Sequence, residues 1–210
     1  MKQNSIEDKV ERYYSEKIKK FGPTPQGVDW NGESSQNLRF DQLLKLIDPL
    51  AEKSTLLDFG CGYGALLDYL VKLKIDFHYT GFDISKEMIK TAKQIHPSNS
   101  AIWASEEGEL SKYDYVVASG IFNVMENSSR GEWEEYIFET ISLMNVLSSK
   151  GFAFNLLTKY SDTHKMKENL FYADPMLLFD HCKTTYSKSV ALLHDYPLYE
   201  FTIIVRKNIL

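Results

Sequence analysis

The sequence has few cysteines and no long apolar run. Its 210 residues contain two cysteines, Cys61 and Cys182, which are too few for the disulfide framework of a small secreted domain or for a zinc cluster. No segment reaches the roughly 18 apolar residues that a membrane-spanning helix needs, and the polar stretch 1–14 lacks the apolar core of a signal peptide. We therefore expect a cytoplasmic protein that has no membrane partner and no metal site.

Clustered positive charge is also absent from the sequence. The net charge is −5 and the pI is about 5.6, and the lysines and arginines form no block. Proteins that bind along the phosphates of DNA or RNA normally carry a basic stripe or patch. We therefore expect no nucleic-acid partner, and the sequence leaves the oligomeric state open.

Strand and helix patterns alternate after residue 54. Short apolar runs typical of strands occupy 55–60, 78–85, 101–105, 113–122 and 151–158. Helical periodicity occupies 64–73, a stretch after the N-cap candidate Ser85, 132–147 and 174–182. Two last strands, 189–196 and 200–207, are joined by a link too short for a parallel crossover, which needs about a dozen residues. This order predicts an α/β fold whose doubly wound, mostly parallel sheet ends in a C-terminal antiparallel hairpin.

The first 54 residues have a different character from the rest of the chain. Helical patterns at 5–21 and 34–50 flank a Gly- and Pro-rich loop, 22–33, that carries Trp30 and Asn31. We expect a single domain over 1–210, with 1–54 as a helical cap or lid and 55–210 as the core of the sheet. Trp30 and Asn31, together with Tyr13 and Tyr14, are candidates to close over a ligand; the alternative is that these aromatic rings pack the first helix onto the sheet.

A glycine-rich turn follows the first strand of the predicted sheet. In "DFGCGYG", Gly60, Gly62 and Gly64 alternate with other residues immediately before a helix, and small residues there let a ligand approach the backbone. Dinucleotides and S-adenosyl-L-methionine both bind at such strand-to-helix turns, and with Ala65 the stretch also fits the dinucleotide pattern. The glycines by themselves therefore leave both ligands open.

Three further features bear on the ligand: Asp83 indicates an adenosine site without distinguishing the two ligands, and the other two favour S-adenosyl-L-methionine. Asp58 ends the strand just before Gly60, where a carboxylate suits a cationic amine and would sit poorly beside a pyrophosphate. Asp83 ends the second strand, where a carboxylate accepts hydrogen bonds from ribose hydroxyls of either ligand. The predicted sheet also ends in an antiparallel hairpin, whereas a dinucleotide-binding fold would usually repeat a second mononucleotide-binding half, and no such half is visible in the sequence.

The stretches "LLDFGCGYGALL", "GFDIS" and "YDYVVASGIF" resemble the successive cofactor motifs of class I S-adenosylmethionine-dependent methyltransferases of the small bacterial type. The resemblance spans roughly residues 36–207 and implies a seven-stranded, Rossmann-like sheet with a reversed last strand. It also implies that the cofactor's methionine part is wrapped by Asp58, Gly60, Cys61, Gly62 and Gly64.

The resemblance assigns the remaining cofactor contacts as well. It implies that Asp83 binds the ribose, with Ile84 beside the adenine. It places the adenine edge near Ser105 and Glu106, and it brings Ser119 and Gly120 to the site from the end of the fourth strand. Relatives often carry a histidine near residues 122–123, and this chain does not.

Methyl transfer by this family is an in-line displacement that needs alignment and the exclusion of water. An amine acceptor reacts in its free form, whereas a hydroxyl or carbon acceptor needs a base. His194 in "LLHDY" is the favoured base because its unperturbed pKa lies near neutrality; the alternative is a structural surface histidine. Arg39 is a candidate partner for the cofactor carboxylate, or else a solvated residue of an amphipathic helix.

The sequence thus predicts a methyltransferase that acts on a small-molecule acceptor. Three alternatives stay open: a methyltransferase that acts on a protein, an NAD(P)-dependent oxidoreductase, and a catalytically silent cofactor-binding partner module. The predicted site also implies that Asp83→Ala or Gly60→Val abolishes cofactor binding.

Overall fold

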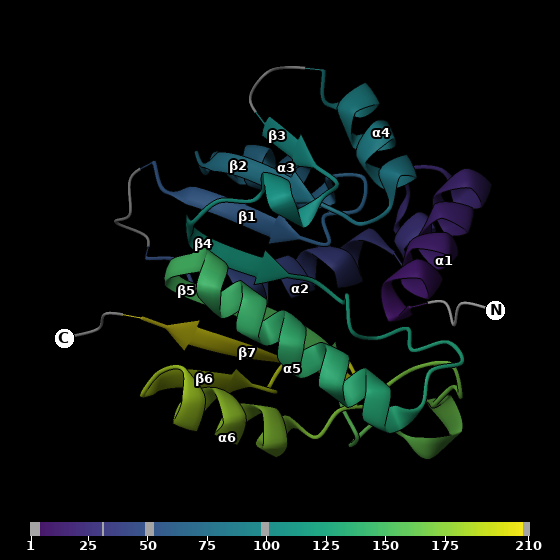
Figure 1. Ribbon diagram of the computed structural model, residues 1–210, viewed down its shortest axis with the longest axis vertical. Coiled ribbons are helices and arrows are strands. Elements are labelled where there is room, and N and C mark those ends of the chain that lie inside the picture. The colour runs from purple at the N-terminus through teal and green to yellow at the C-terminus, as the bar shows by residue number, and fades with distance from the viewer. Residues whose placement is uncertain (1–4, 31, 49–52, 98–100, 208–210) are drawn as a thin grey trace.

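The computed structural model describes residues 5–30, 32–48, 53–97 and 101–207. One sheet of seven strands has the order β3-β2-β1-β4-β5-β7-β6 (Figure 1). Its strands are β1 (Thr55–Phe59), β2 (His78–Phe82), β3 (Ala101–Ala104), β4 (Tyr113–Ala118), β5 (Ser148–Leu157), β6 (Ser189–Leu193) and β7 (Glu200–Arg206). Neighbours among β1 to β5 pair in parallel, and β7 pairs antiparallel with both β5 and β6. The predicted doubly wound sheet with its C-terminal hairpin is confirmed.

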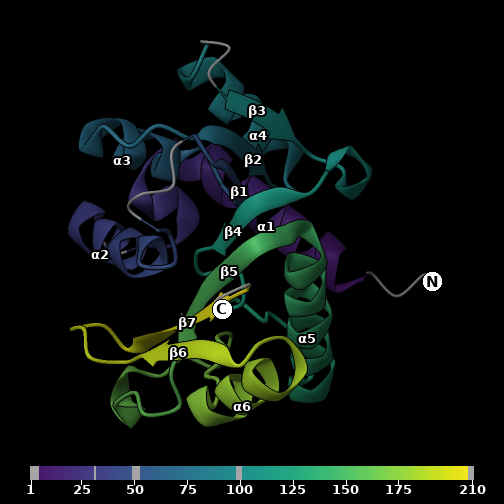
Figure 2. The same ribbon diagram turned by 90° about the vertical axis from the view of Figure 1, so that its left-hand side faces the viewer.

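Helices cover both faces of this sheet and its carboxyl edge. The helices are α1 (Ile6–Phe21), α2 (Glu33–Leu44), α3 (Ala65–Leu73), α4 (Lys86–Ile95), α5 (Arg130–Leu147) and α6 (Pro175–Thr185), with short 3-10 turns η1 (Pro25–Val28), η2 (Glu107–Glu109) and η3 (Thr163–Lys165). Figure 2 shows α2 and α3 on one side of the sheet and α5 and α6 on the other. Side-chain caps begin several of them, as at Ser5, Ser85 and Ser129, where each hydroxyl accepts a backbone N–H of the first turn.

The two faces of the sheet carry separate apolar cores. Phe152 and Phe154 of β5 point toward α5 and α6, whereas Ala153 between them packs with residues of α2 and α3. This alternation follows from the two-residue period of a strand. Because β1, β4 and β5 are buried on both sides, they read in the sequence as nearly continuous apolar runs.

Element ends differ from the sequence prediction in ways that matter for the site. The fourth strand ends at Ala118, so the residues that follow form a turn at the carboxyl edge. The sixth strand ends at Leu193, which places His194 in the link to β7. Helix α2 ends at Leu44, and residues 49–50 of the predicted helix lie outside the described residues.

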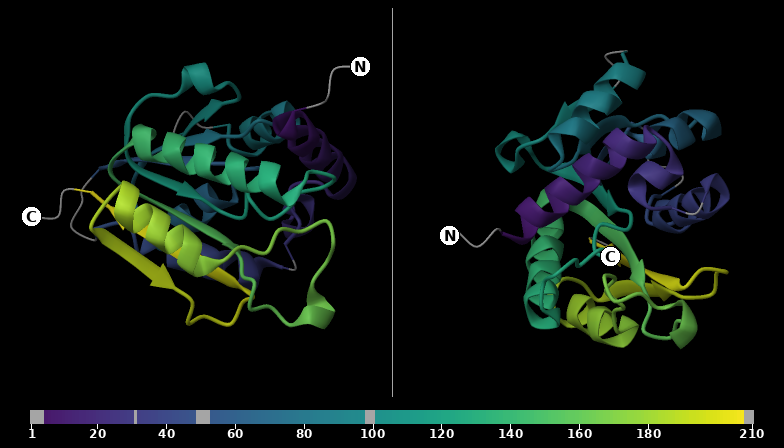
Figure 3. Two further views of the ribbon diagram at one scale, coloured as in Figure 1. Left: turned by 60° about the horizontal axis from the view of Figure 1, so that its bottom comes forward. Right: turned by 90° about the vertical axis from the view of Figure 1, so that its right-hand side faces the viewer.

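Helix α1 lies across the carboxyl ends of the central strands (Figure 3). It packs on α4 through a buried contact in which the hydroxyls of Ser15 and Ser85 are 2.7 Å apart. It is joined to the loop after η1 because Tyr13 and Lys17 both donate to the carboxylate of Asp29. The N-terminal segment therefore covers the edge of the sheet at which α/β proteins bind their ligands.

Candidate active site

A cavity lies between the carboxyl ends of β1, β2 and β4 and the N-terminal segment. Its place follows from the strand order, because the chain runs outward from β1 through β2 and β3 and then returns to β4 on the other side of β1. The predicted site residues that line the cavity are Trp30, Asp58, Gly60, Cys61, Gly62, Asp83, Ile84, Ser119 and Gly120.

The glycine loop turns tightly against the end of β2. The backbone N–H groups of Gly60 and Cys61 both donate to the carbonyl of Phe82, at 2.7 and 2.9 Å. Gly60 has φ +80°, and a Cβ built on it would lie 2.2 Å from Cγ2 of Ile121 in the turn after β4. This position therefore requires glycine for its conformation and for the space above it. The result is bare backbone at the wall of the cavity.

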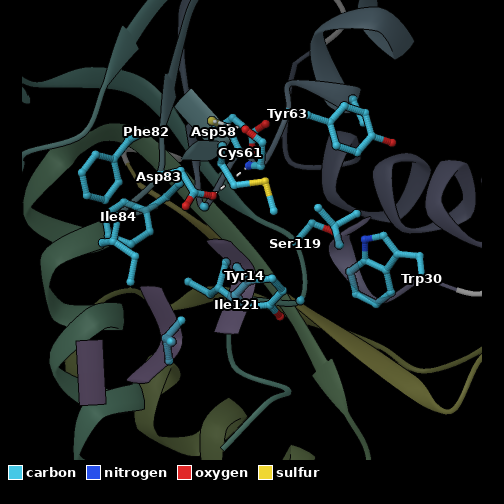
Figure 4. Close-up of a pocket in the computed structure, with 18 of the residues that line it drawn as sticks. Tyr14, Trp30, Asp58, Cys61, Tyr63, Phe82, Asp83, Ile84, Ser119 and Ile121 are labelled. Carbon is cyan, nitrogen blue, oxygen red and sulfur yellow. Dashed lines mark hydrogen bonds between the residues drawn. The ribbon is translucent and has the colours of Figure 1, made fainter. Parts of the chain in front are cut away.

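Asp83 connects the glycine loop with the start of α4. Its carboxylate accepts the backbone N–H of Gly62 and that of Ser85, both at 2.9 Å (Figure 4). Burial raises the pKa of Asp83 to about 6, although these two hydrogen bonds oppose the rise. A carboxylate held in this way has lone pairs left for hydroxyl donors in the cavity.

Asp58 is the second carboxylate in the wall of the cavity and is 3% exposed. The hydroxyl of Tyr79 donates to it at 2.7 Å. Burial raises the pKa of Asp58 to about 7, the Tyr79 hydrogen bond lowers it, and the charge of Asp83 raises it further. Two poorly solvated carboxylates on one small cavity favour a cationic ligand, because a cation restores the stabilisation that water no longer provides.

Trp30 closes the cavity over the end of β4. Gly120 has φ +70°, and a Cβ on it would lie 2.1 Å from Cη2 of Trp30. The backbone N–H of Gly120 donates to Oδ1 of the buried Asn155 at 2.7 Å, which fixes this turn on β5. The indole of Trp30 therefore packs directly against the backbone of Gly120, where any other residue would place a side chain in its way. Asn31, the neighbour predicted to act with Trp30, lies outside the described residues.

Arg39 is placed behind Trp30, outside the lining of the cavity. Its guanidinium carbon lies 3.8 Å from the centre of the Trp30 ring. Nε and Nη2 donate to the two carboxylate oxygens of Glu200, at 2.8 and 2.6 Å, and Nη1 donates to the carbonyl of Ser35. Arg39 thus has Glu200, a residue distant in the sequence, as its carboxylate partner, and its predicted contact with the cofactor carboxylate stays a prediction.

The structure brings four other predicted residues to places outside the cavity lining. Gly64 faces Trp103, whose Cη2 would lie 2.5 Å from an added Cβ, so this glycine serves the packing of α3. The backbone N–H groups of Ser105 and Glu106 bind Glu109, and the Glu106 carboxylate pairs with Lys86 at 2.8 Å.

His194 is exposed and has ring contacts with Tyr160 and Phe201. Strand β6 is the edge strand, three positions from β4, or about 14 Å at the usual strand spacing. His194 therefore does not line the cavity, and the sequence could not reveal this because it does not specify which strand lies at the edge.

Several lining residues were not predicted from the sequence. Gln36 and Phe40 of α2 reach the cavity, as do Val10 of α1 and Tyr136 of α5. Tyr14, predicted only as a candidate lid residue, lines it too. The spacing of Gln36, Arg39 and Phe40 indicates one helical face, which is a signal that could have been used. Nothing local marks Tyr136, because it approaches from a helix far along the chain.

Two other findings concern the described part of the chain. No three His, Cys, Asp or Glu side chains in it gather closely enough to hold a metal ion. None of the helices in 5–30, 32–48, 53–97 or 101–207 is long and apolar enough to cross a membrane.

Comparisons with known proteins agree with this architecture. A family model described as a methyltransferase domain matches residues 57–145. "Putative methyltransferase Rv1506c" of Mycobacterium tuberculosis is 51% identical over 158 residues, which cover 75% of this chain and 95% of that protein. "Putative methyltransferase 235L" of Invertebrate iridescent virus 6 is 34% identical over 96 residues, or 42% of this chain and 36% of that protein.

Solved structures show the same fold. The magnesium protoporphyrin IX methyltransferase ChlM of Synechocystis, with bound S-adenosylhomocysteine (SAH), superimposes with a TM-score of 0.67 at 14% identity, covering 97% of this chain and all of that one. The DhpI–SAH complex superimposes with a TM-score of 0.63 at 13% identity, covering 98% and 99% of the two chains.

The chain belongs to the methyltransferase family, and its fold is that of class I S-adenosylmethionine-dependent methyltransferases. It is thus an enzyme of the methyltransferase class, and the cofactor of that class is S-adenosyl-L-methionine.

Proposed function

We propose that this enzyme transfers the methyl group of S-adenosyl-L-methionine to a small-molecule acceptor by in-line displacement in the cavity beneath α1. The observation that carries the proposal is the pair of poorly solvated carboxylates, Asp58 and Asp83, beside the bare backbone of Gly60. That combination fits a ligand that has an ammonium group and ribose hydroxyls and that lies close against the protein backbone.

Each of these residues has a specific task in the proposal. Asp58 holds the ammonium of the cofactor's methionine part, and Asp83 accepts hydrogen bonds from the ribose hydroxyls. The backbone at Gly60 and Gly62 leaves room for the part of the cofactor that joins its ammonium group to its ribose. Ile84 lies beside the adenine. When bound, S-adenosyl-L-methionine supplies a methyl group on a positively charged sulfur, a good leaving group.

The covering elements support a reaction that is protected from water. Trp30 and α1 close the cavity from the N-terminal side, and exclusion of water strengthens the interactions that align the acceptor. The net charge of −5 favours a small molecule over nucleic acid as the acceptor. The proposal assigns no step to His194, and a cytoplasmic location stays a prediction from the sequence.

Isothermal titration of the purified chain with S-adenosyl-L-methionine, SAH and NAD tests this proposal. Roughly micromolar binding of the first two and none of NAD is expected. Binding of NAD alone would favour the oxidoreductase alternative. Cofactor binding with no methyl transfer to any acceptor in a broad screen would favour a silent partner module.

A further inference from the structure

The charge of the cavity limits what the acceptor can be. Among the described residues that line it, the charged side chains are Asp58 and Asp83, and there is no lysine, arginine or histidine. An anionic group placed there would meet two carboxylates and no cation, which is the costly arrangement for a charge taken out of water. A carboxylate or phosphate acceptor is therefore disfavoured.

Two cations of the N-terminal segment, Arg39 and Lys17, do not change this charge balance. Arg39 donates to both oxygens of the fully buried Glu200 and stands behind the indole of Trp30. Lys17 is paired with Asp29. Each of these cations is therefore balanced by a carboxylate of its own. When S-adenosyl-L-methionine is bound as proposed, its ammonium and sulfonium offset Asp58 and Asp83, and its own carboxylate leaves the cavity with a net negative charge that still disfavours an anionic acceptor.

The described lining also offers no base for a hydroxyl or carbon acceptor. Burial raises the pKa of Tyr136 to about 12 and holds that of Tyr14 well above its usual value. Burial likewise raises the pKa of the Cys61 thiol. Asp58 and Asp83 are engaged by the cofactor in the proposed function, on which this inference rests. A general base must be unprotonated at the working pH. The tyrosine phenols and the Cys61 thiol are all protonated there, so none of them can act as the base.

One polar group in the cavity wall has no partner. Oγ of Ser119 is buried and makes no hydrogen bond with any described residue. Buried polar groups are normally paired, so an orphaned hydroxyl in a ligand cavity points to a partner on the ligand. In Figure 4, Ser119 lies on the side of the cavity next to Trp30, with Asp83 and Ile84 on the other side.

We propose that the acceptor is an amine whose N–H donates to Oγ of Ser119. The amine reacts as its free base, which forms when the protonated amine loses a proton to water before it enters the cavity. Its nitrogen lone pair forms the new bond to the methyl carbon while the carbon–sulfur bond breaks with its electron pair going to sulfur. The positive charge moves from sulfur to nitrogen and stays in a cavity lined by carboxylates, and the ammonium proton leaves afterwards to water. No group of the protein has to take a proton during the transfer.

Matched probes that share one aromatic body test the proposal. The full chain is saturated with SAH at pH 8, and 2-phenylethylamine, 2-phenylethanol and phenylacetate are titrated by ligand-observed NMR. The amine is expected to bind at least tenfold tighter than phenylacetate and tighter than the alcohol. Ser119→Ala is expected to weaken amine binding about fivefold, the effect of one net hydrogen bond, whereas the control Ser111→Ala, at an exposed serine outside the cavity lining, leaves it unchanged.

Two results would overturn the inference: the alcohol or phenylacetate binds as tightly as the amine, or the amine does not bind. Replacing SAH by S-adenosyl-L-methionine gives a second readout, because mass spectrometry is expected to detect the N-methyl product, and an O-methyl product alone would contradict the amine assignment. SAH binding is measured first. If it fails, the proposed function fails; if SAH binds and the order of the probes is reversed, only the amine inference fails.

Discussion

Arg39 and Glu200 form a bidentate ion pair that joins α2 to the first residue of β7. The two hydrogen bonds measure 2.8 and 2.6 Å, and the side chains are 8% and 0% exposed. The guanidinium also stacks on Trp30, the indole that covers Gly120. The pair therefore anchors the N-terminal cover of the cavity to the far half of the sheet.

Removing one partner of this pair is expected to be costly. Glu200→Gln leaves a buried guanidinium without its counter-charge and should lower the free energy of unfolding by about 3–5 kcal/mol. Urea denaturation measures this change. The matched control Glu134→Gln breaks the more exposed pair with Arg130 and should change the free energy by no more than about 1 kcal/mol. Equal effects of the two variants would show that burial of the Arg39–Glu200 pair has no energetic consequence.

Trp30 is expected to contribute to ligand affinity through its contact with the cavity. Trp30→Ala should weaken SAH binding about tenfold, in line with the roughly 1–2 kcal/mol that a well-packed aromatic contact provides. Calorimetric titration measures the affinity. Phe21→Ala, on the same N-terminal segment but 40% exposed and outside the cavity lining, should bind as the unaltered chain does. An unchanged affinity in Trp30→Ala would remove Trp30 from the site.

A side chain at position 120 is expected to displace the indole. Gly120→Ala places a Cβ against Trp30 at a φ of +70° and should lower both stability and SAH affinity. Gly131→Ala is the control, because nothing lies within 4 Å of its added Cβ. In the double variant with Trp30→Ala, the loss of stability should be smaller than the sum of the single losses. Additive losses would mean that the clash with Trp30 is not the cause.

The raised pKa values of Asp58 and Asp83 predict two opposite pH dependences. Both carboxyl groups bind protons more tightly in the folded chain than in the unfolded one, where carboxyls titrate near 4. The unfolding free energy of the ligand-free chain should therefore fall as pH rises from about 4 to about 7. Asp58→Asn should flatten this slope and the control Asp76→Asn should not, as measured by urea unfolding at several pH values.

Cofactor affinity should change in the other direction, because a cationic ligand requires the ionised carboxylates. Binding of S-adenosyl-L-methionine should tighten as pH rises from about 5.5 toward 7, by up to about tenfold per pH unit for each proton released. Calorimetry across this range measures the trend. A pH-independent affinity would contradict the assignment of Asp58 to the ammonium.

The assignment of the ribose contact and the glycine turn has a direct test. Asp83→Ala removes the acceptor of the Gly62 and Ser85 N–H groups, and Gly60→Val places a branched side chain where Ile121 already lies. Both variants should lose SAH binding, with circular dichroism as the check on folding. Retained affinity in a folded variant would refute the site.

Local patterns in the sequence determined much of this protein. Four features depend only on residues close in sequence. They are the alternation of strands and helices, the glycine turn after β1, the acids at the carboxyl ends of β1 and β2, and the short link before β7. Local sterics and hydrogen bonding control such features, so the fold and the sheet side of the cavity could be predicted.

Contacts between distant segments were decided only by the tertiary structure. The order of strands and the path of the N-terminal segment determine three such contacts. They set the partner of Arg39, the position of the Trp30 indole, and the distance of His194 from the cavity. Glu200 meets Arg39 because β7 inserts between β5 and β6, and the same insertion puts β6 and His194 at the edge. Pairings of this kind arise from packing across the whole sheet, which no short stretch of sequence encodes.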